Sequence, residues 1–132
     1  VWGDEDQLIQ IFLNLVKNAA EAAHSRGDGR GEITIRTAYR HGVRVRAAKG
    51  QELRGATLEV RVTDNGPGVT THLRESLFQP FVTTKANGAG LGLALVSKLV
   101  ANHGGLIDFD SEPGRTTFRV LLPIASEEEF SA

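Results

Sequence analysis

Four short segments of the sequence carry residue types that together suit a bound nucleotide. They are Asn14–Ala19, Asp64–Gly68, Phe78–Phe81 and Gly88–Leu93. The first would place side-chain amides on a helix, the second sets an acid before a glycine turn, and the last is a glycine loop that runs into a helix. Each segment alone is weak evidence. In this order, however, they can surround ATP from three sides.

The acid of the second segment offers a way to select the base. Asp64 follows an alternating run that predicts a strand, and Gly66 and Gly68 permit positive φ and let a flat ligand approach the backbone. A carboxylate at the mouth of such a turn can accept a hydrogen bond from the exocyclic amine of adenine, which guanine does not offer at that position. The alternative is a plain turn in which Asp64 and Asn65 cap their own backbone.

Two amides of the first segment suit a metal ion. Asn14 and Asn18 are one helical turn apart on one face, and asparagine is a mediocre helix former. An amide oxygen can ligate Mg²⁺ when phosphates supply most of the negative charge. The alternative is a solvated polar stripe on the helix.

The glycine loop predicts a phosphate site. Gly88, Gly90 and Gly92 open directly into a helix, whose N-terminal N–H groups favour bound phosphate. Leu93 stands where a dinucleotide fingerprint needs its third glycine, and no Gly-Lys-Ser/Thr of a Walker loop follows. A structural hinge is the alternative.

The loop before these glycines contains few residues that can pack, so we expect residues 82–91 to be mobile. Lys85 could neutralise a terminal phosphate, with Thr83 or Thr84 donating hydroxyls, although a lone loop lysine is usually solvated. Phe78 and Phe81 are expected to anchor the base of the loop in the core. The four histidines show no metal-ligand spacing.

The elements that position these segments follow from periodicity. Asp4 and Gln7 predict a helix start, and breakers after Ser25 predict its end. Its buried stripe is expected to be Leu8, Phe12, Leu15, Val16, Ala19 and Ala23. We expect a short helix over 71–76 and a long one that begins near Leu93 and is stopped by Gly104. Strands are expected over 33–37, 58–63, 106–110 and 116–122. Residues 39–46 either extend the first strand or form a separate one. The result is a two-layer α/β sandwich, a mixed sheet covered on one face by about three helices.

Composition sets the broad class. A chain of 132 residues fits one domain, which we place at 1–125, with an acidic and disordered tail over 126–132. A net charge of −1 argues against nucleic acid or a membrane surface as partner, and the absence of cysteine excludes disulfides and thiolate metal sites. No apolar run reaches the ~18 residues of a membrane span. We expect a cytoplasmic domain, and the missing initiator Met suggests a piece of a longer protein.

Taken in order, the segments resemble the catalytic ATP-binding domain of bacterial sensor histidine kinases, part of the superfamily (Bergerat or GHKL fold) that includes DNA gyrase B, Hsp90 and MutL. The resemblance covers nearly the whole chain. Its boxes correspond to Asn14–Ala23, Asp64–Gly68, Phe78–Phe81, Gly88–Leu93 and Gly114–Phe118. Five boxes in order make a highly specific signal.

The resemblance implies a Mg-ATP site and a role for each box. Asn18 would ligate Mg²⁺, Asp64 would contact the adenine amino group, and Thr116 would support adenine from the last strand. Asn14, Asn18 and Lys85 are the catalytic candidates, since phosphoryl transfer mainly needs positioning and charge neutralisation. The nucleotide-binding candidates are Asn14, Lys17, Asn18, Asp64, Gly66, Gly68, Val69, Phe81, Thr83, Thr84, Lys85, Gly88, Gly90, Leu91, Gly92, Leu93 and Thr116.

Two positions on the first helix qualify the resemblance. Gyrase-type ATPases place a water-activating glutamate where this chain has Asn14, which is no strong base, so we expect poor hydrolysis and phosphate donation to an external histidine. Many membrane-bound kinases carry a phosphate-contacting lysine where this chain has Glu21. Lys17 could make that phosphate contact instead, but it projects about 100° of helical arc away from the neighbouring Asn18.

A narrower resemblance is to the nitrogen-regulation group of these kinases, the NtrB type. It rests on Pro80–Gly88, Gly90–Val96 and Ser111–Phe118. It implies a cytosolic kinase with an NtrC-type response regulator and control by a PII signalling protein. No histidine has the context of a phosphoacceptor, so the fragment should bind ATP, be monomeric, and depend on the separate dimerisation helices of a homodimeric kinase.

Three other readings remain open. A gyrase- or MutL-like ATPase module would hydrolyse ATP at a substantial steady-state rate. A nucleotide-sensing regulatory module would bind ATP or ADP without transferring phosphate. A serine kinase of the anti-sigma-factor type shares these boxes, and its phosphoprotein would be acid-stable, whereas phosphohistidine is acid-labile.

Overall fold

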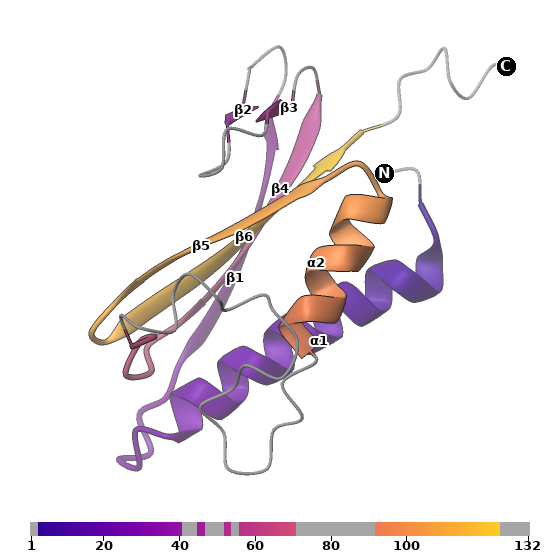
Figure 1. Ribbon diagram of the computed structural model, residues 1–132. Helices are drawn as coiled ribbons and strands as arrows, with labels where there is room; N and C mark the ends of the chain where they lie inside the picture. Colours follow the sequence, from indigo (N-terminus) through magenta and orange to yellow (C-terminus); the bar gives the residue numbers. More distant parts are fainter. Residues whose placement is uncertain (1–2, 41–44, 47–51, 54–55, 71–91, 125–132) are drawn as a thin grey trace, which may run out of the picture.

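The fold is taken from a computed structural model, which describes residues 3–40, 45–46, 52–53, 56–70 and 92–124. Figure 1 shows the arrangement of the elements. In chain order they are α1 (Glu5–His24), β1 (Ile33–Arg40), β2 (Val45–Arg46), β3 (Glu52–Leu53), β4 (Thr57–Asp64), α2 (Gly92–Asn102), β5 (Leu106–Glu112) and β6 (Arg115–Pro123).

Four strands form the main sheet in the order β1-β4-β6-β5, and both helices lie on one side of it (Figure 1). The predicted two-layer α/β sandwich is therefore confirmed. The expectation of a mixed sheet is wrong for the strands that the structure describes, because every pair of neighbours is antiparallel. The chain does cross over through α2 from β4 to β5, two strands that run the same way. The hairpin partner β6 inserts between them, so these parallel strands never pair.

The first helix begins and ends where the sequence predicts. Asp4 is its N-cap and accepts a hydrogen bond from the Gln7 N–H at 3.0 Å, and Ser25 follows its last turn. The backbone N–H of Asp4 donates to Nε2 of His103, which ties the start of α1 to the end of α2. The third helix, expected over 71–76, lies outside the described residues.

The core lies between the helices and the inner face of the sheet. Its fully buried members on α1 are Ile11, Leu15 and Ala19, which repeat every four residues. The predicted stripe missed Ile11 and included Leu8 and Phe12, which are only partly buried. The stripe is rotated because the helix packs along its i, i+4 ridge, with Val96, Val100 and Phe118 among the residues of the same cluster.

The edge strand β1 departs from its prediction in burial. The alternation over 33–37 predicted a half-buried strand, yet Ile35 is 54% exposed and Tyr39 is 63% exposed. β1 lies at the edge of the sheet, beyond most of the cover that α1 provides (Figure 1). The run after Tyr39 resolves into an extension to Arg40 and a separate strand, β2, which pairs with β3. In the part of the chain that the structure describes, neither helix combines the length and apolarity that a membrane crossing requires.

Candidate functional site

The predicted acid lies at the inner edge of the sheet. Asp64 is the last residue of β4 and is only 2% exposed, and its Oδ1 accepts a hydrogen bond from the Gly66 N–H at 2.9 Å. Burial raises the pKa of Asp64, and the hydrogen bond from Gly66 opposes this rise without cancelling it. No basic side chain contributes to that shift among the described residues. The site thus holds a buried carboxylate that has hydrogen-bonding capacity and, in the described part of the chain, no ion-pair partner.

The two glycines of the turn are required for different reasons. Gly68 has a φ of +91°, which residues with a side chain rarely adopt, and a Cβ there would lie 2.6 Å from the carbonyl oxygen of Glu112. Gly66 has no positive φ; a Cβ on it would lie 2.6 Å from the carbonyl oxygen of Ala22 on α1. The turn therefore packs directly against the backbone of the helix that carries the amides.

Two hydroxyl groups, from Thr116 and Ser111, form a hydrogen-bonded chain that ends at the backbone N–H of Val69, just after the turn. Thr116 lies opposite Asp64 in the β4–β6 register and is buried. Its Oγ1 lies 2.8 Å from Oγ of the buried Ser111, which accepts a hydrogen bond from the Val69 N–H at 2.8 Å. The Thr116 hydroxyl is thus engaged within the protein, and Val69 packs its side chain against the core.

One face of α1 connects the turn with the start of α2. Near the middle of α1, the Asn14 Oδ1 lies 3.8 Å from the position that a Cβ on Gly92 would occupy. Ala22, two turns later, contacts Gly66. Eight residues of helix separate these contacts by about 12 Å, with Asn18 half-way between them. The face therefore spans a distance suited to an extended nucleotide, with the acid at one end and a helix N-terminus at the other.

The other predicted residues on the two helices lie as follows. Asn14 and Asn18 are half-buried, and the Asn14 amide donates to the Gln10 carbonyl at 2.9 Å. Lys17 and Glu21 are exposed. Leu93, on the first turn of α2, packs against the core cluster. The loop 82–91 and the tail 126–132 lie outside the described residues. So do the remaining predicted site residues, which are Phe81, Thr83, Thr84, Lys85, Gly88, Gly90 and Leu91.

Sequence reasoning missed the hydrogen bonds that Ser111 and Asn65 make to position the Asp64 turn. Ser111 is a buried polar residue on a strand whose other inward side chains are apolar, which is the signal that could have found it. Asp64 caps the backbone of its own turn through the Gly66 N–H, as the plain-turn alternative supposed, but Asn65 does not. Its Oδ1 accepts a hydrogen bond from the Glu32 N–H at 2.7 Å instead. A contact across 33 residues has no local sequence signal.

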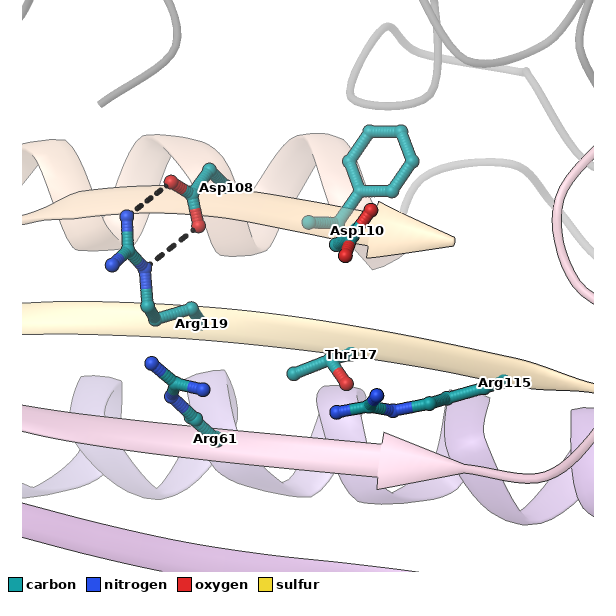
Figure 2. Close-up of a pocket in the computed structure, with 7 residues that line it drawn as sticks. Arg61, Asp108, Asp110, Arg115, Thr117 and Arg119 are labelled. Atoms are coloured by element: carbon teal, nitrogen blue, oxygen red, sulfur yellow. Dashed lines mark hydrogen bonds and ion pairs between the residues drawn. The ribbon is translucent and has the colours of Figure 1, made fainter. Parts of the chain in front are cut away.

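Two hollows elsewhere do not contain these groups. One, of about 250 Å³, lies on the outer face of the sheet, where Figure 2 shows Arg119 and Asp108 paired through two hydrogen bonds of 3.0 and 2.6 Å. Arg61, Arg115 and Thr117 also line it (Figure 2). The other, of about 660 Å³, is mainly apolar and lies along the first half of α1. Neither includes a residue of the Asp64 turn, so neither is the site that the sequence predicts.

Comparisons with known proteins agree with this geometry. Residues 3–126 match the family model described as histidine kinase-, DNA gyrase B-, and HSP90-like ATPase. A sensory histidine kinase/phosphatase NtrB from Azospirillum brasilense is 55% identical over 99% of this chain, which spans 32% of that protein. A mycobacterial sensor histidine kinase, MprB, superposes with a TM-score of 0.73 at 27% identity, covering 93% of this chain and 76% of that one. Full-length ShkA in complex with AMPPNP gives a TM-score of 0.67 at 32% identity over 94% of this chain and 23% of that one.

Proposed function

The chain belongs to the histidine kinase-, DNA gyrase B- and HSP90-like ATPase family, and on that basis we propose that it is the catalytic, ATP-binding domain of a nitrogen-regulation sensor kinase. It binds Mg-ATP and donates the γ-phosphoryl group to a histidine on a separate dimerisation domain. The chain spans about a third of the curated relatives that it matches, so the acceptor histidine belongs to the remainder of such a kinase.

The observation that carries this proposal is the line of contacts along α1. Gly66 beside Asp64 packs on Ala22 at one end, and Gly92 faces Asn14 at the other. In the proposed complex the adenine amine donates to Asp64, with Thr116 on the adjacent strand. The phosphates extend along Asn18 toward the first N–H groups of α2, where the helix dipole favours negative charge. A related kinase crystallised with AMPPNP supports the choice of ligand.

The residues present fit Mg²⁺ only together with the nucleotide. No cluster of three His, Asp or Glu side chains that could hold a metal ion alone exists in the described part of the chain. Asn18 supplies a neutral amide oxygen on the face between the two glycine contacts, so phosphate oxygens must provide the charge. When bound, the ion neutralises charge on the transferred phosphoryl group.

Asn14 favours a kinase over a hydrolase. Its side chain faces Gly92 at the start of α2, close to where the phosphates would lie, and an amide cannot remove a proton from water. The domain therefore protects bound ATP from hydrolysis until an acceptor side chain arrives. Lys85 and the threonines before it would neutralise and bind the terminal phosphate.

The partners follow from the same assignment. The intact kinase is a cytoplasmic homodimer through its acceptor helices and transfers phosphate to an NtrC-like response regulator, with a PII protein as its controller. The isolated domain, residues 1–125 with an acidic tail, is monomeric. The resemblance to kinases of the NtrB type supports these partners.

Two measurements test the proposal. Calorimetric titration with ATP, GTP and ADP, with and without Mg²⁺, should show Mg-dependent binding that prefers adenine. Labelled ATP with a separately produced acceptor domain should then yield acid-labile phosphate on that domain. Steady-state hydrolysis without an acceptor would favour the ATPase reading, binding without transfer would favour a nucleotide sensor, and acid-stable label would favour a serine kinase.

A further inference from the structure

The connection between α1 and β1 is hydrogen-bonded to the turn that follows Asp64. It passes close enough to the turn for Arg26 to donate from Nη1 to the carbonyl oxygen of Asn65 at 2.9 Å. The backbone carbonyl of Glu32 accepts from the Asn65 N–H at 3.3 Å. The turn that carries the acid is thus held by a segment more than 30 residues away in the sequence.

Asn65 uses each of its polar groups in this attachment. Besides its backbone N–H and carbonyl, its Oδ1 accepts from the Glu32 N–H at 2.7 Å and its Nδ2 donates to the Arg30 carbonyl at 2.9 Å. An amide side chain suits these two contacts, because it offers a donor and an acceptor side by side on one short group that carries no charge. The backbone that follows Asp64 is therefore restrained.

Arg26 is itself held in place by Asp28. Its Nε and Nη2 donate to the two carboxylate oxygens at 3.2 and 2.9 Å, and Oδ1 of Asp28 also accepts from the Arg30 N–H at 2.9 Å. The hydrogen bond from Arg26 lowers the pKa of Asp28, so the pair is fully charged at neutral pH. A bidentate fork of this kind fixes the plane of the guanidinium.

We propose that Arg26, Asp28 and Asn65 are positioning residues for adenine recognition: they hold the Asp64–Gly66 backbone so that the Asp64 carboxylate keeps the orientation that accepts the base amine. The proposal rests on the proposed nucleotide site. These residues would act through the backbone of the turn and not through contact with the nucleotide.

The energetics separate this role from simple stabilisation of the fold. The Arg26 and Asp28 side chains are 32% and 42% exposed, and exposed ion pairs contribute little to stability. Asp64, by contrast, has no ion-pair partner among the described residues, and it accepts a hydrogen bond from the Gly66 N–H. Its orientation therefore depends on the backbone beside it, and a hydrogen bond weakens steeply when its geometry is displaced.

The test is the ratio of the Kd values for ATP and GTP, measured by calorimetry on the 132-residue chain well below its Tm. Arg26→Lys keeps the charge but cannot bond both Asp28 oxygens and the Asn65 carbonyl together. We expect ATP affinity to fall roughly tenfold, because small misplacements of a binding group have effects of that order, while GTP affinity stays unchanged. Asn65→Asp, which loses the donor to Arg30, should act in the same way. Arg36→Lys, an exposed arginine of β1, is the matched control.

The outcomes separate the two proposals. If Arg26→Lys and Asn65→Asp keep the wild-type ratio, whatever their Tm, the three residues only fasten a loop and the inference is overturned. If either variant fails to fold, Asp28→Asn provides the same comparison, with a smaller expected loss of about threefold. If the wild-type chain itself shows no preference for ATP, the proposed function fails and this inference fails with it.

Discussion

Glu59 and Asp64 lie on the same strand, and each is 2% exposed, but they face opposite sides of the sheet because they are an odd number of positions apart, five. Burial disfavours ionisation of Glu59, yet hydrogen bonds from Arg40 and Arg61 outweigh it and lower the pKa of Glu59. Burial raises the pKa of Asp64, which receives only a backbone N–H. Equal solvent exposure therefore goes with opposite pKa shifts, and the arginine partners are what lowers the pKa of Glu59.

This contrast separates a structural acid from a functional one. Glu59 is neutralised within the fold by two arginines, so its remaining hydrogen-bonding capacity is small. Asp64 lies beside a glycine turn and lacks a cation among the described residues, so its ionisation is unfavourable until a donor such as the adenine amine arrives. The charged carboxylate is thus unfavourable in the empty protein and is stabilised when a ligand donates a hydrogen bond to it. This difference favours ligands that carry such a donor.

Removing the charge of Asp64 should give the largest effect. Asp64→Asn keeps the shape but exchanges the charged acceptor for an amide, and we expect ATP affinity to fall by roughly 10- to 100-fold, since hydrogen bonds to charged groups contribute about 1.5–3 kcal/mol. The empty protein should become more stable at neutral pH. Calorimetry and thermal unfolding measure the two effects, and unchanged ATP affinity would contradict the role of Asp64.

The pH dependence of that variant sharpens the comparison. Because the folded-state pKa of Asp64 is raised, the folded state holds a proton that the unfolded state has already released, and stability is lost as pH rises through the folded pKa. The stability advantage of Asp64→Asn should therefore be largest at neutral pH and shrink toward acid. If the stability advantage of Asp64→Asn does not depend on pH, the pKa of Asp64 is not raised in the folded protein.

Asn18 tests the other end of the site with a smaller expected effect. Asn18→Ala removes the proposed amide ligand, so Mg²⁺ should no longer strengthen ATP binding, a loss of about tenfold by analogy with ordinary hydrogen bonds to charged groups. Asn102→Ala, the same change at the exposed end of α2, is the control. A variant that still needs Mg²⁺ for tight binding would rule out Asn18 as a ligand.

Glu59→Gln should affect stability and leave nucleotide affinity unchanged. The two arginines are about 40% exposed and can turn toward water, so we expect a loss of about 1–2 kcal/mol, less than for a fully buried pair. With its folded pKa lowered, Glu59 contributes stability above its ordinary pKa that is lost as pH falls through the folded value. The difference from wild type, measured by denaturant unfolding, should thus vanish in acid, as it does for Asp64→Asn, but at neutral pH it should be a loss of stability and not a gain.

What could be predicted from the sequence follows the range of the interactions. Local patterns predicted the helix start at Asp4, the position of Asp64 at the end of a strand and the last two strands of the chain, because each depends on neighbours in the sequence. The antiparallel sheet order and the attachment of Asn65 to Glu32 depend on distant partners, and periodicity carries no information about these. The pairing of Glu59 with Arg40 likewise joins residues 19 positions apart, and the alternation that predicts the strand carries no information about it.

Thr57, the third buried polar side chain of β4, gives the smallest expected effect. It is 0% exposed, and its Oγ1 has no hydrogen-bond partner in the described structure, so Thr57→Val should raise the free energy of unfolding by up to about 1 kcal/mol. Thr63→Val is the matched control on the same face of the same strand. It removes a 2.9 Å bond to the Thr117 hydroxyl and should lower stability. If Thr57→Val instead proves as harmful as Thr63→Val, the Thr57 hydroxyl has a hydrogen-bond partner, and Thr57, Glu59 and Asp64 are then all hydrogen-bonded.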